Sequence, residues 1–193
     1  LMCLRPDLKP TVAVARTARI RATNPNHLSV KEANVKLDAY YEYIDHGPKP
    51  SVVVIEDLDD DKGYGCFWGE VNSAIHFGMG CKGVITDGGI RDLPDIADGF
   101  QMLAGRVVPS HAFVHLVDFA GSVTVAGMRV FNGDVIHADQ HGAVVLPVRA
   151  LPEINNAAQL IAKREKVIIE AARSPGFNVD ALREAKGDAS EIH

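Results

Sequence analysis

The feature that most constrains this chain is a short apolar run enclosed by glycines, Gly83-Val84-Ile85-Thr86. A run of this length and composition is typical of a strand that is buried on both faces of an α/β sheet. The preceding segment, 71–79, carries apolar or small residues at the spacing of one buried helical face. A helix that leads directly into a buried strand predicts an α/β fold.

The loop that leaves this strand, 87–92, reads Asp-Gly-Gly-Ile-Arg-Asp. Ligands of open α/β sheets bind just past the carboxyl ends of strands, and paired glycines let the backbone approach a ligand closely. Arg91 offers a planar fork for a carboxylate, and Asp92 offers hard oxygen for a divalent cation. Glu70 opens the preceding helix, where free N–H groups suit an anion. If helix and strand pack antiparallel, these residues converge. The Arg-Asp pair taken alone is equally typical of a surface salt bridge.

Periodicity predicts the remaining elements. Alternating or continuously apolar runs indicate strands over 11–19, 51–56, 107–117, 122–125, 128–131, 134–138 and 143–147. Helical spacing indicates helices over 30–44, 93–100 and 152–172. Arg16 and Arg19 lie on the first strand, where they could line a site, but we expect them to be solvated.

Length and composition indicate one folded domain with a proper core, because the chain has 193 residues, 47% of them hydrophobic. We expect this domain to span 1–176 and to be followed by a polar tail at 177–193, which is either mobile or lies on a neighbour. The chain begins at Leu1, close to a strand, so we also expect that N-terminal residues are missing in front of it.

Charge and cysteine content exclude several classes. The net charge of −5 argues against a broad nucleic-acid or anionic-membrane surface. Three cysteines without a CxxC pair argue against a disulfide framework or a structural zinc site. No apolar run approaches the roughly 20 residues of a membrane span, and no signal-peptide pattern is present, so a cytoplasmic protein is expected.

Three apparent motifs are set aside. The acidic stretch 56–63 lacks the glycine and glutamate of a calcium loop, so a solvated turn is expected. Residues 78–83 spell GxGxxG but follow a helix and open a strand, which argues against a dehydrogenase or methyltransferase. Five residues could bind a transition metal: His111 and His115 on one strand face, and His137, Asp139 and His141 around a turn. Their spacing does not define a set of three or four ligands, so ordinary histidines on strands are the simpler interpretation.

A family resemblance rests on Gly69-Glu70 and, twenty residues on, Arg91-Asp92, with Asp87-Gly88-Gly89 before them. Together with the stretches 130–134 and 141–147, this pattern resembles the RraA-like family from about residue 4 to 176. That family includes the class II 4-hydroxy-4-methyl-2-oxoglutarate / 4-carboxy-4-hydroxy-2-oxoadipate aldolases and the ribonuclease E inhibitor RraA. Its aldolases usually carry Asp where this chain has Glu70. The family normally has one or two helices before the first strand, so the resemblance implies that such helices are missing in front of Leu1.

The resemblance implies an RraA-like β/β/α swivelling-type single domain, a homotrimer or hexamer with a site between protomers, a divalent cation such as Mg²⁺ or Mn²⁺, and pyruvyl-containing keto-acid substrates. Asp92 would be the metal ligand. Arg91 would bind the substrate carboxylate and keto oxygen, and the backbone amides of Val71 and Asn72 would hold the pyruvyl carboxylate. Glu70 would orient a water molecule for proton transfer. Glu165, on the C-terminal helix of an adjacent subunit, would assist.

The expected reaction is therefore retro-aldol release of pyruvate from 4-hydroxy-2-keto diacids, and oxaloacetate decarboxylation passes through the same enolate. Lys82 lies at the wrong end of its strand for a Schiff base, so a metal-dependent mechanism is favoured. The alternative is a non-catalytic regulator of ribonuclease E. Such a protein would not need Glu70, Arg91 and Asp92 together, so we favour an enzyme.

Overall fold

In the computed structural model, which describes residues 1–193, the predicted buried strands form the centre of an eight-stranded sheet. Its order is β1-β7-β5-β3-β2-β12-β13, and β9 pairs with the far half of β2. Strands β7, β5, β3 and β2 are mutually parallel, and the other pairings are antiparallel. The bounds are β1 Met2–Cys3, β2 Thr11–Arg21, β3 Ser51–Asp57, β5 Cys81–Thr86, β7 Gln101–Ala104, β9 His115–Phe119, β12 Val135–Asp139 and β13 Gly142–Leu146.

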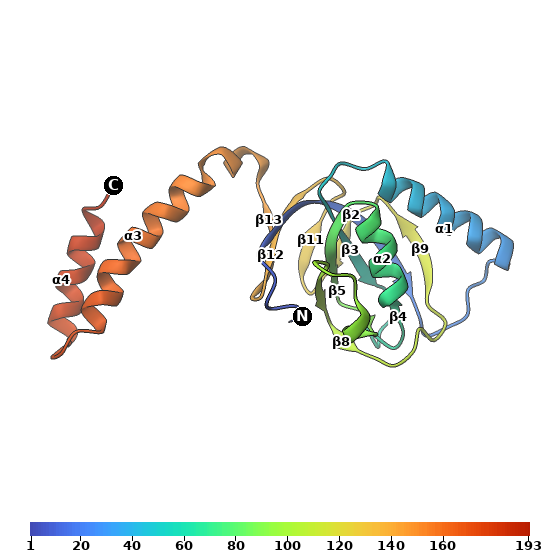
Figure 1. The fold of residues 1–193 in the computed structure, drawn as a ribbon, viewed down its shortest axis with the longest axis horizontal. Coiled ribbons are helices and arrows are strands. Elements are labelled where there is room, and N and C mark those ends of the chain that lie inside the picture. The colour runs from blue at the N-terminus through green and yellow to red at the C-terminus, as the bar shows by residue number, and fades with distance from the viewer. The chain divides into compact units, whose positions relative to one another are not determined.

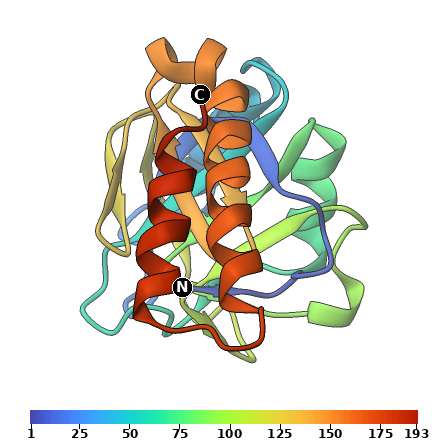
Figure 2. The same ribbon diagram turned by 90° about the vertical axis from the view of Figure 1, so that its left-hand side faces the viewer.

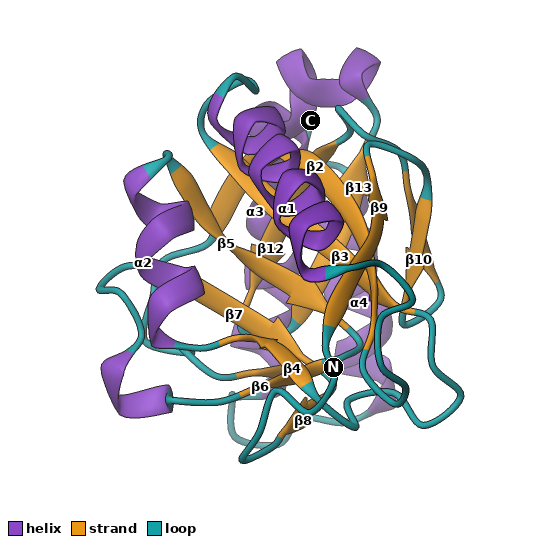
Figure 3. Cartoon of the chain, turned by 90° about the vertical axis from the view of Figure 1, so that its right-hand side faces the viewer, coloured by secondary structure: helices purple, strands orange, loops and turns teal.

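The central strands have continuous apolar sequences because a hydrophobic core covers each face of the sheet (Figure 1). Val53 and Ile55 face a core that includes Tyr40 of α1 (Val30–Asp45), and Figure 3 shows α1 and α2 (Glu70–Gly78) on this side of the sheet. Val52 and Val54 face a second core closed by the hairpin β10 (Val123–Val125) and β11 (Met128–Val130). Each fully buried side chain of this kind stabilises the fold by roughly 1.5–3 kcal/mol.

Helix α1 is anchored at both ends. Ser29 and Glu32 form a capping box at its start. The helix has no basic residue in its last turn, and Arg16 and Lys49 donate instead to the carbonyls of Tyr43 and Ile44. The prediction that Arg16 is solvated is therefore wrong, because its guanidinium is buried and stacks 3.5 Å from the Tyr43 ring centroid.

A small parallel sheet, β4-β6-β8, carries the segments around the Arg-Asp pair. Its strands are β4 Cys66–Trp68, β6 Gly89–Ile90 and β8 Arg106–Val107. Since β4 and β6 are parallel neighbours, the residues that follow them, Gly69 and Arg91, leave the sheet at the same edge. This arrangement brings the start of α2 next to the loop that follows β6.

Two local predictions between β6 and β9 are wrong. The helix predicted over 93–100 is only a 3₁₀ turn, η1 (Leu93–Asp95), and the short strand β7 follows it. The strand predicted over 107–117 is split, because β8 ends at Val107 and β9 begins at His115. Between them the chain turns at Ala112, whose φ of 46° interrupts an extended backbone.

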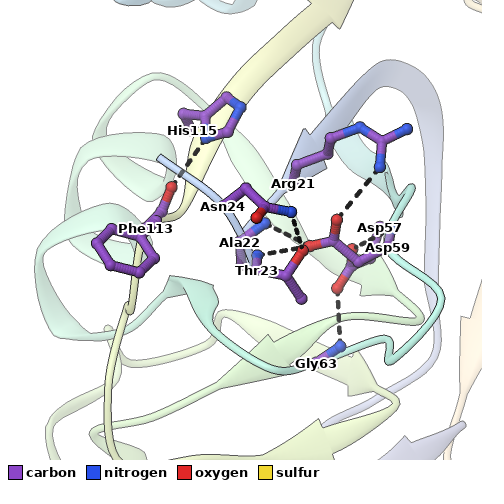
Figure 4. A network of polar contacts seen from close by, with 9 residues as sticks. All are labelled: Arg21, Ala22, Thr23, Asn24, Asp57, Asp59, Gly63, Phe113 and His115. Carbon is purple, nitrogen blue, oxygen red and sulfur yellow. Dashed lines mark hydrogen bonds and ion pairs between the residues drawn. The ribbon is translucent and has the colours of Figure 1, made fainter. Parts of the chain in front are cut away.

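The solvated turn expected over 56–63 is only partly observed: Asp60, Asp61 and Lys62 are exposed, whereas Asp57 and Asp59 are buried and make the polar contacts drawn in Figure 4. Asp59 accepts from the amides of Ala22 and Thr23, and Asp57 accepts from the amides of Asp59 and Gly63. Burial raises the pKa of Asp57. Burial alone would also raise the pKa of Asp59, but the hydrogen bonds from Ala22 and Thr23 outweigh it, so that pKa is lowered. The Asp59 carboxylate thus links its loop to the end of β2, and the Asp57 carboxylate stabilises the turn that runs to Gly63.

The chain divides into two compact units, Leu1–Leu146 and Pro147–His193. The second unit contains the 3₁₀ segment η2 (Val148–Glu153), helix α3 (Ile154–Ala172) and helix α4 (Val179–Ser190). Figure 2 shows α3 and α4 running side by side. The polar tail, for which no helix was predicted, thus contains α4, and Asn178 caps this helix by accepting from the amides of Asp180 and Ala181. None of the helices combines the length and apolar character that a membrane span requires.

Candidate functional site

The site is built where α2 begins. Gly69 is the N-cap residue of α2 and has an extended backbone, with φ of −165°, which any residue adopts. Space is what requires glycine here, because a Cβ atom would overlap the Asp92 carboxylate and lie 3.1 Å from Cγ of Arg91. The helix start and the Arg-Asp loop are therefore in direct contact, as the antiparallel packing of helix and strand predicts.

Asp92 caps the helix from across this contact. Its Oδ2 accepts from the amide of Glu70 at 3.3 Å and lies 3.2 Å from Nε of Arg91 in an ion pair. The residue adopts the left-handed conformation, with φ of 57°, which Asp and Asn tolerate better than other non-glycine residues. Its second oxygen, Oδ1, accepts no hydrogen bond within the chain.

Arg91 is held on two sides. Its backbone amide donates to the carbonyl of Trp68 at 3.0 Å, which extends the β4–β6 pairing. Its Nη1 donates to the carbonyl of Cys66 at 3.2 Å, while Nε faces Asp92. Nη2 has no partner within the chain, so one edge of the guanidinium stays available to a ligand.

The first turn of α2 offers further free donors. The amides of Val71 and Asn72 have no acceptor within the chain, and Val71 is 64% exposed. The turn is nevertheless fixed, because the Asn72 side chain accepts from the Tyr41 hydroxyl at 2.9 Å and donates to the carbonyl of Phe67. Glu70 is exposed, and its carboxylate has no partner within the chain.

A buried histidine supports this turn from behind. The Nδ1–H of His76 donates to the carbonyl of Asn72 at 2.6 Å, so Nε2 is left to accept from the Tyr40 hydroxyl at 2.9 Å. His76 is fully buried, and that burial lowers its pKa from 6.5 to about 4. The His76 side chain is therefore uncharged at neutral pH, and its two hydrogen bonds stabilise the first turn of α2.

An open cavity of about 600 Å³ lies beside the ion pair. Arg91 and Asp92 form its polar part, and the rest of its wall is apolar: Leu93, Pro94, Val107, Val108 and Pro109. A larger cavity of about 710 Å³, between the 24–28 loop and β9, shares no residue with it. The Arg-Asp cavity is thus accessible to a small ligand that has an anionic end.

The other sequence candidates are not assembled. No group of three or more His, Cys, Asp or Glu side chains is arranged to hold a metal ion. His111 lies in a loop and His115 on β9, so the expected shared strand face is absent. His137, Asp139 and His141 line one open cavity, in which Oδ1 of Asp139 lies 3.5 Å from Nδ1 of His141. Glu165 is exposed on α3, in the second unit, whereas the other predicted site residues belong to the first.

Two contributors were missed from the sequence, the glycine requirement at Gly69 and the contact between Cys66 and Arg91. The position of Gly69 directly before the predicted helix could have indicated a close contact at the helix start. Nothing in the sequence pairs Cys66 with Arg91, because the parallel pairing of β4 and β6 creates that contact.

The fold and this site define an α/β protein that presents a helix start, a guanidinium and a carboxylate at the ends of neighbouring parallel strands. The chain belongs to the RraA-like family (Aldolase/RraA), whose sequence profile matches residues 4–145. This match confirms the family expected from the Glu70 and Arg91-Asp92 pattern.

The similar proteins agree with this assignment. An uncharacterized protein of Methanocaldococcus jannaschii is 32% identical over 124 residues, which cover 63% of this chain and 60% of that protein. The chain thus spans less than two thirds of that relative's length. An uncharacterized protein from Pseudomonas syringae has a solved structure with a TM-score of 0.70 and 22% identity, covering 97% of this chain and 80% of that one.

A second solved structure is that of RraAS2 from Streptomyces coelicolor, described as an unusual member of the RNase ES inhibitor RraA protein family. It aligns with a TM-score of 0.65 and 24% identity, covering 86% of this chain and 78% of that one. At these identities the likeness shows the fold, and it confirms the predicted RraA-like α/β fold.

Proposed function

We propose that this protein is a divalent-metal-dependent lyase that acts on pyruvyl-containing keto acids. It would release pyruvate from 4-hydroxy-2-keto diacids by retro-aldol cleavage and would decarboxylate oxaloacetate. The observation that carries the proposal is the gathering of unpaired groups at the start of α2. Oδ1 of Asp92, Nη2 of Arg91 and the amides of Val71 and Asn72 all lack partners within the chain.

The donor set fits Mg²⁺ or Mn²⁺ better than zinc. Asp92 supplies one free, hard carboxylate oxygen in an accessible cavity, and no cluster of three ligands is present. Mg²⁺ is commonly held by one or two carboxylates, with water and substrate oxygens completing its shell. When bound at Asp92, the cation would supply positive charge close to the developing enolate.

The pyruvyl half would be held by the chain's own donors. The free amides of Val71 and Asn72 and the positive end of the α2 dipole suit the substrate carboxylate. Nη2 of Arg91 would donate to the keto oxygen, where negative charge accumulates as the bond breaks. The partners of Nε and Nη1 keep this group in place before the substrate arrives.

In the retro-aldol step, the C4 hydroxyl loses its proton and becomes a carbonyl while the C3–C4 bond breaks. The electron pair of that bond forms the enolate of pyruvate, and protonation at C3 completes the product. Glu70 has a free carboxylate at the helix start and would take part in these proton transfers. In oxaloacetate the same electron flow expels carbon dioxide.

Lys82 does not suit a Schiff-base mechanism. Lys82 is exposed near the start of β5, and its amino group lies 5.6 Å from the centroid of the Phe77 ring. The Arg-Asp loop leaves the opposite end of that strand. The family likeness supports a homotrimer or hexamer, in which Glu165 of a neighbouring copy would complete the site.

A second candidate function is that of a non-catalytic regulator of ribonuclease E, which the fold likeness to RraAS2 favours. A regulator of this kind works by protein contact and gives no role to the free groups around Arg91. The two functions differ in whether pyruvate is produced.

The test is pyruvate release coupled to lactate dehydrogenase, with 4-hydroxy-2-keto diacids and oxaloacetate, and with Mg²⁺, Mn²⁺ or EDTA. We expect metal-dependent turnover that Arg91→Ala abolishes and that Arg129→Ala, a change on the distant hairpin strand β11, leaves intact. Turnover that survives EDTA would contradict the metal. Absence of pyruvate from every substrate, together with capture of ribonuclease E, would favour the regulator.

A further inference from the structure

Cys66, on β4, contacts the guanidinium of Arg91 through two of its atoms. Its carbonyl oxygen lies 3.2 Å from Nη1 of Arg91, and its Sγ lies 3.4 Å from the same nitrogen. The thiol is fully buried, so the contact is not shared with solvent. The carbonyl contact is available to any residue at this position, whereas the sulfur contact requires this side chain.

The orientation of the thiol is fixed by a third residue. The carbonyl of Ser110 accepts from the amide of Cys66 at 3.2 Å and from its Sγ–H at 3.3 Å. Because the S–H bond points to Ser110, the sulfur lone pairs are left to face Arg91. The contacts form a directed chain, from the N–H of Arg91 to the sulfur of Cys66 and from the S–H of Cys66 to Ser110.

This series of hydrogen bonds determines which edge of the Arg91 guanidinium stays free. Nη1 is occupied by Cys66 and Nε faces Asp92, so Nη2 is the one nitrogen of Arg91 without a partner. Burial raises the pKa of the Cys66 thiol, although Arg91 acts in the opposite direction. The thiol therefore stays protonated at neutral pH and retains the hydrogen that it donates to Ser110.

We propose that Cys66 is a positioning residue, which locks the Arg91 guanidinium so that Nη2 faces the substrate's keto oxygen and carboxylate. The proposal rests on the proposed function for the role of Arg91, but the locking itself is a property of the free protein. The sulfur acts through Arg91 and touches no substrate.

The chain offers a matched control in Cys81. It is also a fully buried cysteine, and its Sγ lies 3.1 Å from the Ser51 hydroxyl, on β5 and away from Arg91. Cys66→Ala and Cys81→Ala both remove one buried sulfur and leave a similar void. A loss that appears only in the first variant is therefore specific to Arg91.

The experiment measures pyruvate affinity by calorimetry in the presence of Mg²⁺. Because the Cys66–Arg91 contact is made before pyruvate binds, its loss acts through the freedom that the Arg91 side chain regains, which predicts roughly three- to tenfold weaker binding for Cys66→Ala, substantial rescue by Cys66→Ser, and wild-type affinity for Cys81→Ala. Equal weakening in the two alanine variants, or wild-type affinity in Cys66→Ala, would overturn the proposal.

A second readout needs no ligand and separates this proposal from the function of the site. In ¹⁵N-labelled protein, the heteronuclear NOE of the Arg91 Nε–Hε group reports the order of the guanidinium. It should fall in Cys66→Ala and stay at the wild-type value in Cys81→Ala. If pyruvate does not bind even the wild type, the proposed function fails, while an NOE unchanged in Cys66→Ala would overturn the positioning role by itself.

Discussion

The buried His76 should make the protein's stability depend on pH in a way that can be calculated. Its folded-state pKa is about 4, against an ordinary value of 6.5. Between these values the unfolded chain binds the proton and the folded chain does not. The stabilisation is therefore complete above pH 6.5 and is lost as the pH falls toward 4.

The magnitude follows from the size of the shift. A difference of 6.5 − 4, at 1.36 kcal/mol per pKa unit, amounts to about 3 kcal/mol of unfolding free energy. That is a large fraction of the 5–15 kcal/mol typical of a domain. Protonation adds a hydrogen to Nε2 of His76, which can then no longer accept from the Tyr40 hydroxyl, so the packing behind the turn of α2 on which the proposed site depends should loosen.

The assay is urea unfolding at pH 7.5, 6.5, 5.5 and 4.5, with His76→Gln and His141→Gln compared with the wild type. His141 is a suitable control because its side chain is 80% exposed. The raised pKa of Asp57 contributes with the opposite sign, so the difference between wild type and His76→Gln isolates the histidine. Equal slopes in those two proteins over this range would refute the reasoning.

Two further substitutions probe the packing. Gly69→Ala forces a Cβ atom onto the Asp92 carboxylate, so we expect about 1–3 kcal/mol of destabilisation by urea unfolding and at least a tenfold loss in kcat/KM on oxaloacetate. Wild-type stability and activity in this variant would show that the contact is not tight. Asp59→Ala leaves the buried amide of Ala22 and the amide of Thr23 without their acceptor, which should lower the unfolding free energy by about 2–4 kcal/mol. Asp60→Ala, an exposed neighbour, should change it by less than about 0.5 kcal/mol.

The apolar periodicity of the sequence correctly predicted the central strands of the sheet. The alternation over 11–19 and the apolar run at 51–56 gave β2 and β3, because burial on the sheet faces dictates those residues. The meeting of the helix start and the Arg-Asp loop also followed from the sequence, whereas the need for glycine at position 69 and the contact of Cys66 with Arg91 did not. The helix before β5 and the loop after it meet at one end, so Glu70 and Asp92 come together.

The failures arise where distant residues decide the outcome. Asp59 looks like a solvent-exposed acid until the amides of Ala22 and Thr23 reach it from elsewhere in the chain. Helix α4 was missed because its sequence is polar, and its buried residues are only Ala185 and Ala189. Small residues carry little apolar periodicity, so packing against α3 decides this helix.

The central idea is that a cation at Asp92 and the guanidinium of Arg91 neutralise an enolate together. Oxalate, a planar analogue of that enolate, tests it directly in calorimetric titrations with Mg²⁺ and with EDTA. Asp92→Asn is the informative variant, because asparagine tolerates the left-handed backbone and can still accept from the Glu70 amide. We predict tight oxalate binding only for the wild type with Mg²⁺; equal binding in EDTA, or unchanged Mg²⁺-dependent binding in Asp92→Asn, would contradict the mechanism.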